Sequence, residues 1–333
     1  MKSRWIFLLA IGAAPLVAHA DWAPAVYNDN YVVTVGASVN GSYGQITYSE
    51  PRYGGGNDYL GSVARDVYSI TSSLKTELNN QVRDMAAREQ INFTSGNLYG
   101  DANVTLQPNG AGYLTTRLSG LSYVGSASGT KRIGFLSGTC TVTVRVANIV
   151  ATAQIGSATG GIPDESVGLT ADVSSNANCS NSLQWVPLVG LVINIWAEHE
   201  VTGLIDGAAR DAIATMKDKL FFERDANAYA GLNRIVPADK VIPLPNGQSF
   251  AVGQWLHGQL AWILNNVSAN IVLGRGAVLG IVPGSTTPDS LVTGNVIKFN
   301  LVVGGVTLNI DLREDVIVVW QWRCTRTPCP AIP

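Results

Sequence analysis

The sequence predicts an α+β fold in which a highly curved antiparallel sheet wraps one long and one shorter amphipathic helix. A helical stripe of apolar residues continues over residues 57–91, and alternating strand patterns fill most of the chain after it. The composition agrees, because 46% of the residues are hydrophobic. Only 14% are charged, against ~25% in an average domain. Such a chain buries a large apolar surface or holds an apolar ligand.

Residues 1–20 have the form of a cleaved export signal. Lys2 and Arg4 precede an apolar run at residues 5–17, and Ala18-His19-Ala20 is a small-x-small cleavage site. The apolar run is too short for an anchor, and no other stretch approaches the ~20 residues that span a bilayer. We therefore expect no transmembrane segment and a mature protein that is periplasmic or secreted.

The expected mature chain is mildly acidic. Loss of Lys2 and Arg4 leaves 20 Lys+Arg against 24 Asp+Glu, a net charge of −4. This balance argues against nucleic acid as a partner and against attachment to anionic lipid by charge alone. The sequence leaves a peripheral membrane contact open.

Residues 21–56 form a Gly- and Tyr-rich segment with short strands, and residues 57–333 are expected to form one elongated domain. The domain begins with the long helix, for which Asn57 or Asp58 is the candidate N-cap. Its apolar stripe is Leu60, Val63, Val67, Ile70, Leu74, Leu78, Val82 and Met85. A shorter helix is expected at 203–222, with the stripe Ile205, Ala209, Ile213, Met216 and Leu220.

Alternating patterns predict antiparallel strands between and after these helices. Pro108-Asn109-Gly110 is the turn of one predicted hairpin. The pattern that includes Cys140 and Val146 changes phase after Asn148, which predicts a β-bulge. Residues 250–264 fit a helix or a strand, and we favour a strand.

The clearest hairpin turns at Gly304-Gly305. Counting outward from this turn pairs apolar residues with apolar residues, so one face is buried and the other is wet. The apolar pairs are Val303 with Val306, Leu301 with Leu308, Phe299 with Ile310 and Ile297 with Leu312. A separate last strand is expected at 315–323, and Asp311, Glu314 and Asp315 beside Arg313 are interpreted as a solvated charged turn.

Four cysteines in an exported chain are expected to form disulfides. Proximity favours Cys324 with Cys329, which leaves Cys140 with Cys179. Four cysteines allow three connectivities, so this pairing is a hypothesis.

Catalytic and metal-binding spacings are missing from the sequence. Beyond the signal only His199 and His257 remain, and each is interpreted as structural. We expect no enzyme activity, no metal and no cofactor. Six tryptophans are expected to line a core or cavity rather than to form a sugar-stacking platform: Trp185, Trp196, Trp255, Trp262, Trp320 and Trp322.

This order of elements resembles the tubular lipid-binding superfamily, which includes the bactericidal/permeability-increasing proteins. The resemblance covers most of residues 57–325 and depends on element order and apolar pattern, with local matches at 60–85, 133–155 and 204–220. It implies a curved sheet that leaves an elongated apolar pocket for acyl chains. The chain departs from the cationic endotoxin-binding members in its negative charge, which favours a carrier or a scaffold.

The sequence therefore predicts an exported, non-catalytic protein that binds a lipid or another long apolar molecule. The alternative is a β-rich structural or adhesive cell-surface protein with an ordinary dry core. The predicted pocket is lined by Val63, Val67, Ile70, Leu74, Leu78, Val82, Ile205, Ile213, Met216, Phe299, Leu301, Leu308 and Ile310.

The export signal and the even number of cysteines generate one testable prediction. The intact mass of the exported protein should match a chain that starts at Asp21 and has lost four hydrogens to two disulfides. Two or more thiols that react with an alkylating agent in the absence of reductant would contradict the disulfide part.

Overall fold

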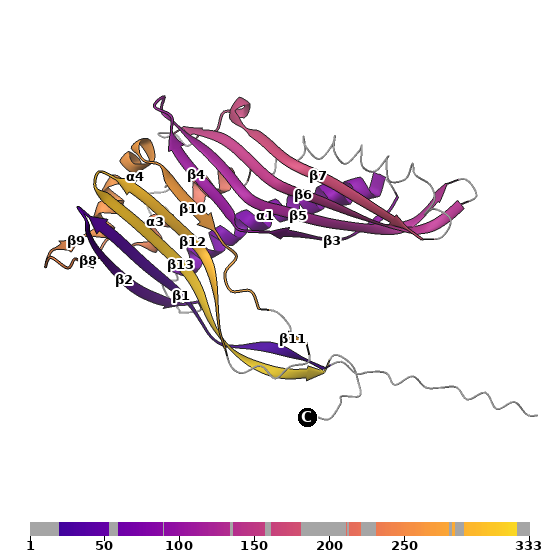
Figure 1. Cartoon of the computed structure of the whole chain (residues 1–333), viewed down its shortest axis with the longest axis horizontal. Coiled ribbons are helices and arrows are strands. Elements are labelled where there is room, and N and C mark those ends of the chain that lie inside the picture. The colour runs from indigo at the N-terminus through magenta and orange to yellow at the C-terminus, as the bar shows by residue number, and fades with distance from the viewer. Residues whose placement is uncertain are drawn as a thin grey trace, which may run out of the picture. The chain divides into compact units, whose positions relative to one another are not determined.

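A computed structural model of the protein describes residues 20–52, 59–88, 90–133, 136–156, 161–180, 211, 213–220, 231–279, 282–283 and 290–324 (Figure 1). The chain divides into two compact units. The larger unit contains residues 29–278 and 293–315, and the smaller contains residues 1–28, 279–292 and 316–333.

The elements follow one another as long strands interrupted by helices (Figure 1). The first part contains β1 (Ala20–Val39), β2 (Ser42–Pro51), α1 (Tyr59–Arg88), β3 (Asn92–Tyr99), β4 (Ala102–Pro108), β5 (Tyr113–Ile133) and β6 (Leu136–Gly156). A 3-10 turn η1 (Asp164–Ser166) and β7 (Gly168–Cys179) follow. After the helical residues 213–220 come α3 (Gly231–Ile235), β8 (Ile242–Pro243), β9 (Ser249–Phe250), α4 (Val252–Asn266), β10 (Ala269–Leu273), β11 (Val282–Pro283), β12 (Ser290–Val303) and β13 (Val306–Cys324).

The larger unit is an antiparallel sheet with the long helix α1 packed on it. Its strands are hydrogen-bonded in the order β2, β1, β13, β12, β10, β4, β5, β6 and β7, and β3 pairs with a further part of β5. The helix α1 contacts β3, β5 and α3, and it runs beside β5 in Figure 1. The predicted α+β class is therefore confirmed, with a long sheet and one long helix.

Every central strand buries one face and exposes the other, as its sequence alternation predicts. Pairing puts Ile271 of β10 opposite Phe299 of β12, and both side chains are buried. The neighbouring pair Asn270 and Asn300 lies on the exposed face. The Gly304-Gly305 turn joins β12 to β13, and the predicted hairpin register is confirmed by the contacts between Asn300 and Asn309 and between Lys298 and Asp311.

The predicted change of phase in β6 is confirmed as a bulge. The register of β6 with β7 shifts between Ala147 and Val150, and Asn148 has a positive φ of 50°. Asparagine tolerates this left-handed conformation better than most residues. The bulge turns Ile149 inward, so the buried face continues through Ala151 and Ile155.

The strand favoured for residues 250–264 is wrong, because α4 occupies Val252–Asn266. Val252 and Leu256, one helical turn apart, are both fully buried. Gln254 is exposed, although a strand would place it on the same face as these two residues. Burial therefore follows the period of a helix.

Two further expectations about the sheet are corrected. The separate strand expected at 315–323 is part of β13, which runs unbroken from Val306 to Cys324. The sheet is also not strongly curled, so the high curvature expected from the sequence is not confirmed. Shifts of register occur where β5 pairs with β3 and with β6 and where β6 pairs with β7, whereas β10 pairs with β4 and with β12 without one.

The smaller unit is a short β arrangement. Strand β1 pairs with β11 through Asp21 opposite Pro283 and Trp22 opposite Val282. Trp320 donates its indole N–H to Ser290 Oγ at 3.0 Å, and Val316 and Val318 are buried. Among the described residues no helix is long and apolar enough to cross a membrane.

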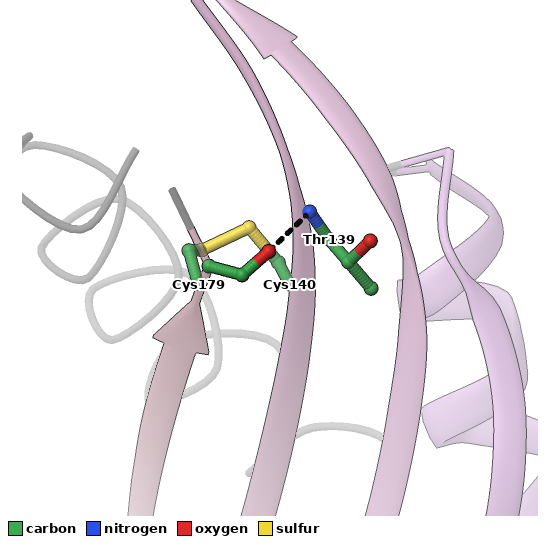
Figure 2. Close-up of a disulfide and its surroundings, with 4 residues drawn as sticks. Thr139, Cys140 and Cys179 are labelled. Carbon is green, nitrogen blue, oxygen red and sulfur yellow. Dashed lines mark hydrogen bonds between the residues drawn. A yellow bond between two sulfur atoms is a disulfide. The ribbon is translucent and has the colours of Figure 1, made fainter. Parts of the chain in front are cut away.

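The disulfide between Cys140 and Cys179 is confirmed and joins β6 to β7 (Figure 2). The two cysteines are directly paired across the strands. Beside them the backbone N–H of Thr139 donates to Ser180 Oγ at 3.1 Å (Figure 2). A disulfide at this position is consistent with an oxidising compartment outside the cytoplasm.

Several predictions lie outside the described residues. They concern residues 1–19 of the export signal, the caps Asn57 and Asp58, Trp185, Trp196, His199, Cys329, and all of the second helix except residues 211 and 213–220. Within 213–220, the predicted stripe residues Ile213, Met216 and Leu220 are each fully buried.

The buried face of the β12–β13 hairpin generates a stability prediction. Leu301 and Ile310 are no more than 1% exposed, and burial of an unpaired carboxylate costs several kcal/mol of a typical ~5 to 15 kcal/mol stability. Leu301→Asp and Ile310→Asp should therefore unfold the protein or make it insoluble. Asn309→Asp on the exposed face of β13 should be nearly neutral, and equal melting temperatures for the two classes would show that the register is wrong.

Candidate functional site

A carboxylate from the sheet caps the N-terminus of the long helix α1. Glu50, near the end of β2, accepts hydrogen bonds from the backbone N–H groups of Tyr59 at 3.0 Å and Leu60 at 2.8 Å. These N–H groups have no partner within the helix, and a negative charge at a helix N-terminus is favourable. Glu50 therefore caps α1 from a strand, a role that the local sequence around residue 57 does not reveal.

The apolar face of α1 is buried along its whole length. Over 30 residues, or ~45 Å at 1.5 Å per residue, the buried positions recur at helical spacing from Leu60 to Ala86. Arg65, Arg83 and Asp84 are exposed on the other side. The helix thus lays a continuous apolar strip on the apolar face of the sheet.

The predicted pocket residues come together in one buried cluster. Each of those that the structure describes is no more than 5% exposed. They are Val63, Val67, Ile70, Leu74, Leu78 and Val82 of α1, Ile213 and Met216 of the shorter helix, and Phe299, Leu301, Leu308 and Ile310 of the hairpin. Ile205 lies outside the described residues.

A second contact holds α1 to the neighbouring helical segments. Arg234 of α3 donates to Asp66 Oδ2 at 2.7 Å and to Ser62 Oγ at 2.8 Å, both on α1. Lys219, from the helical residues 213–220, lies 3.2 Å from the same carboxylate. These contacts hold α1 to α3 and to residues 213–220. Hydrogen bonds between charged groups are stronger than those between neutral groups.

The largest departure from the sequence interpretation is Glu314. The solvated charged turn expected at Asp311, Glu314 and Asp315 is wrong, because Glu314 lies inside β13 with a side chain only 4% exposed. Its carboxylate accepts hydrogen bonds from Arg52 Nη1 at 2.8 Å, Tyr68 Oη at 3.0 Å and the N–H of Ala277 at 2.8 Å. A buried carboxylate is tolerated when it is paired and hydrogen-bonded in this way.

Arg52 connects this carboxylate to a second one. Its Nη1 atom also lies 2.8 Å from Asp29 Oδ2 of β1, and its backbone N–H donates to the carbonyl of Asp29 at 3.0 Å. The Asp29 side chain is 5% exposed, whereas that of Arg52 is 38% exposed. One arginine at the end of β2 therefore ties β1 to β13 and keeps partial access to solvent.

The cluster is packed so closely that glycine is required beside it. A Cβ atom on Gly276 would lie 2.0 Å from Tyr68 Oη and 2.1 Å from Glu314 Oε2. Gly276 also has a φ of +71°, which disfavours other residues. Burial, together with the negative charge of Glu314, raises the pKa of Tyr68 above its usual range. The phenol therefore stays protonated as a hydrogen-bond donor.

The alternating pattern that indicates burial of Glu314 continues from Leu312 to Val316, but Glu314 lies between two strands that were predicted separately. Glu314 has the same strand parity as Leu312 before it and Val316 after it, and all three are buried. Asp29 likewise shares parity with the buried residues Tyr31 and Val33. An acidic residue on the apolar side of an alternating pattern indicates a buried pair, provided that the strand is followed through it.

The structure tests part of the predictions for the histidines and tryptophans. His257 lies on α4, and its Nε2 atom is 2.9 Å from the carbonyl of Val236, so it is a hydrogen-bonded structural residue. Trp255 packs against Phe250 with ring centroids 5.7 Å apart, whereas Trp262 is 50% exposed. Within the described part of the chain no group of three or more His, Cys, Asp or Glu residues could hold a metal ion.

Comparison with solved structures gives distant matches to three chains. No protein-family model matches the sequence, and no curated protein is similar to it. A crystal structure of lipopolysaccharide binding protein matches with a TM-score of 0.24 and 10% sequence identity, covering 89% of this chain and 85% of that chain. A match with so low a TM-score does not relate individual residues of the two chains, so no ligand site is transferred from that protein to this one.

The Glu314 cluster generates a second stability prediction. Glu314→Gln removes the charge that faces Arg52, and breaking a fully buried pair costs ~3 to 5 kcal/mol. Because Arg52 is 38% exposed, we expect a smaller loss of ~2 to 3 kcal/mol in denaturant unfolding.

The matched control for this change is Asp239→Asn. Asp239 lies 3.7 Å from Lys240 but is 76% exposed, so its loss should change stability by less than ~1 kcal/mol. A Glu314→Gln protein as stable as this control would show that the cluster does not stabilise the fold.

Proposed function

We propose that the protein is an exported, non-catalytic carrier or scaffold that binds a lipid or another long apolar molecule. The observation that carries the proposal is the unbroken apolar strip on α1. At ~45 Å it exceeds the ~30 Å hydrocarbon thickness of a bilayer. The strip is therefore long enough to match an extended acyl chain.

The chemistry of the buried layer supports an aliphatic ligand. Among the described residues the large buried side chains are mostly Val, Leu and Ile, and the buried aromatic ones are Tyr31, Tyr123 and Phe299. Ligand sites are lined mainly by apolar groups with few polar ones. We place the ligand between α1 and the hairpin face, against Val67, Ile70, Leu74 and the other pocket residues named above.

The same burial also favours a second candidate function. Side chains that are no more than 5% exposed are what a close-packed dry core would show. The protein would then be a β-rich structural or adhesive cell-surface protein. Denaturing mass spectrometry of a solvent extract of the purified protein separates the two, because co-purified lipid is expected only for the carrier.

A substitution series on α1 tests the location of the ligand. In a dry core a bulkier residue costs ~1 to 3 kcal/mol, whereas a ligand-filled space can accept it. Ile70→Trp and Leu74→Trp should therefore leave the melting temperature of the ligand-free protein nearly unchanged. They should weaken binding of a fluorescent fatty acyl probe at least ~10-fold, which corresponds to ~1.4 kcal/mol.

Asp84→Trp on the exposed side of α1 is the control and should alter neither quantity. A wild-type protein that binds no probe, together with destabilised core variants, would favour the dry core. Probe binding that survives both core substitutions would move the site toward Ile213 and Met216 of the shorter helix.

A further inference from the structure

The exposed face of the sheet carries a hollow that the proposed lipid site does not use. Its volume is about 310 Å³, and it lies across β1, β2, β10, β12 and β13. Its surface is mainly apolar, and the polar groups that reach it come from Tyr43, Asn270, Lys298, Asn300, Asn309 and Asp311. Phe299 and Ile310 form part of its floor, while their buried side chains belong to the opposite face. The two sites are therefore separated by the thickness of the sheet.

Strand register assembles the lining in two adjacent rows. In the first row Asn270 of β10 is paired with Asn300 of β12, and the Asn300 amide donates to Asn309 Oδ1 on β13. In the second row Lys298 Nζ lies 3.8 Å from Asp311 Oδ2. Because backbone pairing fixes these positions, the groups are held in place before any ligand arrives.

The lining offers both donors and acceptors without a net charge. An asparagine amide supplies two N–H donors and a carbonyl acceptor. The Asn270 side chain makes no hydrogen bond with any residue that the structure describes. The cation of Lys298 is balanced by Asp311. A ligand that both donates and accepts hydrogen bonds and carries no charge matches this surface best.

An aromatic ring stands at the edge of the hollow. Tyr43 is 52% exposed, and its hydroxyl donates to Gln45 Oε1 at 2.9 Å. A Cβ atom on Gly36 would lie 2.7 Å from Tyr43 Oη, so glycine at this position lets the ring lie against the sheet. The exposed ring offers an apolar surface beside polar groups, which suits a molecule with one face of C–H groups and a rim of hydroxyls.

We propose that this hollow binds a neutral saccharide. The Tyr43 ring stacks on the sugar, and the amides of Asn270, Asn300 and Asn309 bind its hydroxyl groups. A volume of about 310 Å³ is at the lower end of the ~300 to 1,000 Å³ of small-molecule sites. The site therefore takes a short saccharide or one end of a longer one.

The test is a glycan array that carries both neutral and anionic saccharides, probed with the whole folded protein. Binding to neutral saccharides is expected, followed by titration calorimetry with the best of them in soluble form. Tyr43→Ala and Asn300→Ala should each weaken this binding at least ~10-fold while the melting temperature stays near that of the wild type.

The matched controls are an exposed asparagine and an exposed tyrosine that lie outside the hollow. Asn176→Ala on β7 and Tyr99→Ala on β3 remove the same kinds of exposed side chain elsewhere and should leave binding unchanged. No binding to any neutral saccharide, binding to anionic saccharides alone, or affinity unchanged in both test variants would overturn the proposal. The acyl-probe experiment has an independent outcome, because its variants lie on the opposite face.

Discussion

The larger unit depends on the pairing of one buried carboxylate. Glu314 sits on the apolar face of β13, where an unpaired charge would be prohibitive. Its three hydrogen bonds come from the end of β2, from α1 and from the segment after β10. The carboxylate is satisfied only when all three have reached their places. This requirement selects one arrangement of the helix on the sheet, whereas apolar packing alone would tolerate sliding.

The position of α1 is determined by polar contacts at its first half and by apolar contacts over its length. Glu50 caps its N-terminus, Tyr68 reaches Glu314, and Asp66 receives Arg234. The apolar strip supplies the favourable free energy but little direction, since the hydrophobic effect is not directional. The charged contacts supply the register. The proposed carrier function needs both, because a ligand can share the apolar layer only if the helix is held independently of it.

Much of the fold could be predicted from sequence because the signals are local. The alternation in β12 and β13, the Gly304-Gly305 turn, and the phase change at Asn148 each lie within a few residues. The failures are non-local. Glu314 was assigned to a turn because its partners Arg52 and Tyr68 lie far away in sequence, and α4 was assigned to a strand because its apolar residues fit both periods. The hollow on the exposed face could not be predicted from the sequence for the same reason, since its amides come together only through the pairing of distant strands.

The neighbouring positions of β1 and β13 have a consequence for folding kinetics. Among the described residues the first strand, β1, is hydrogen-bonded to the last, β13, so this part of the sheet forms only after β13 has been made. Folds dominated by such distant pairings form slowly, because the entropy of closing a long loop is lost before any contact rewards it. A nascent chain of this protein therefore stays open until its C-terminal strand is made. That delay suits the export proposed above, in which the polypeptide crosses a membrane unfolded.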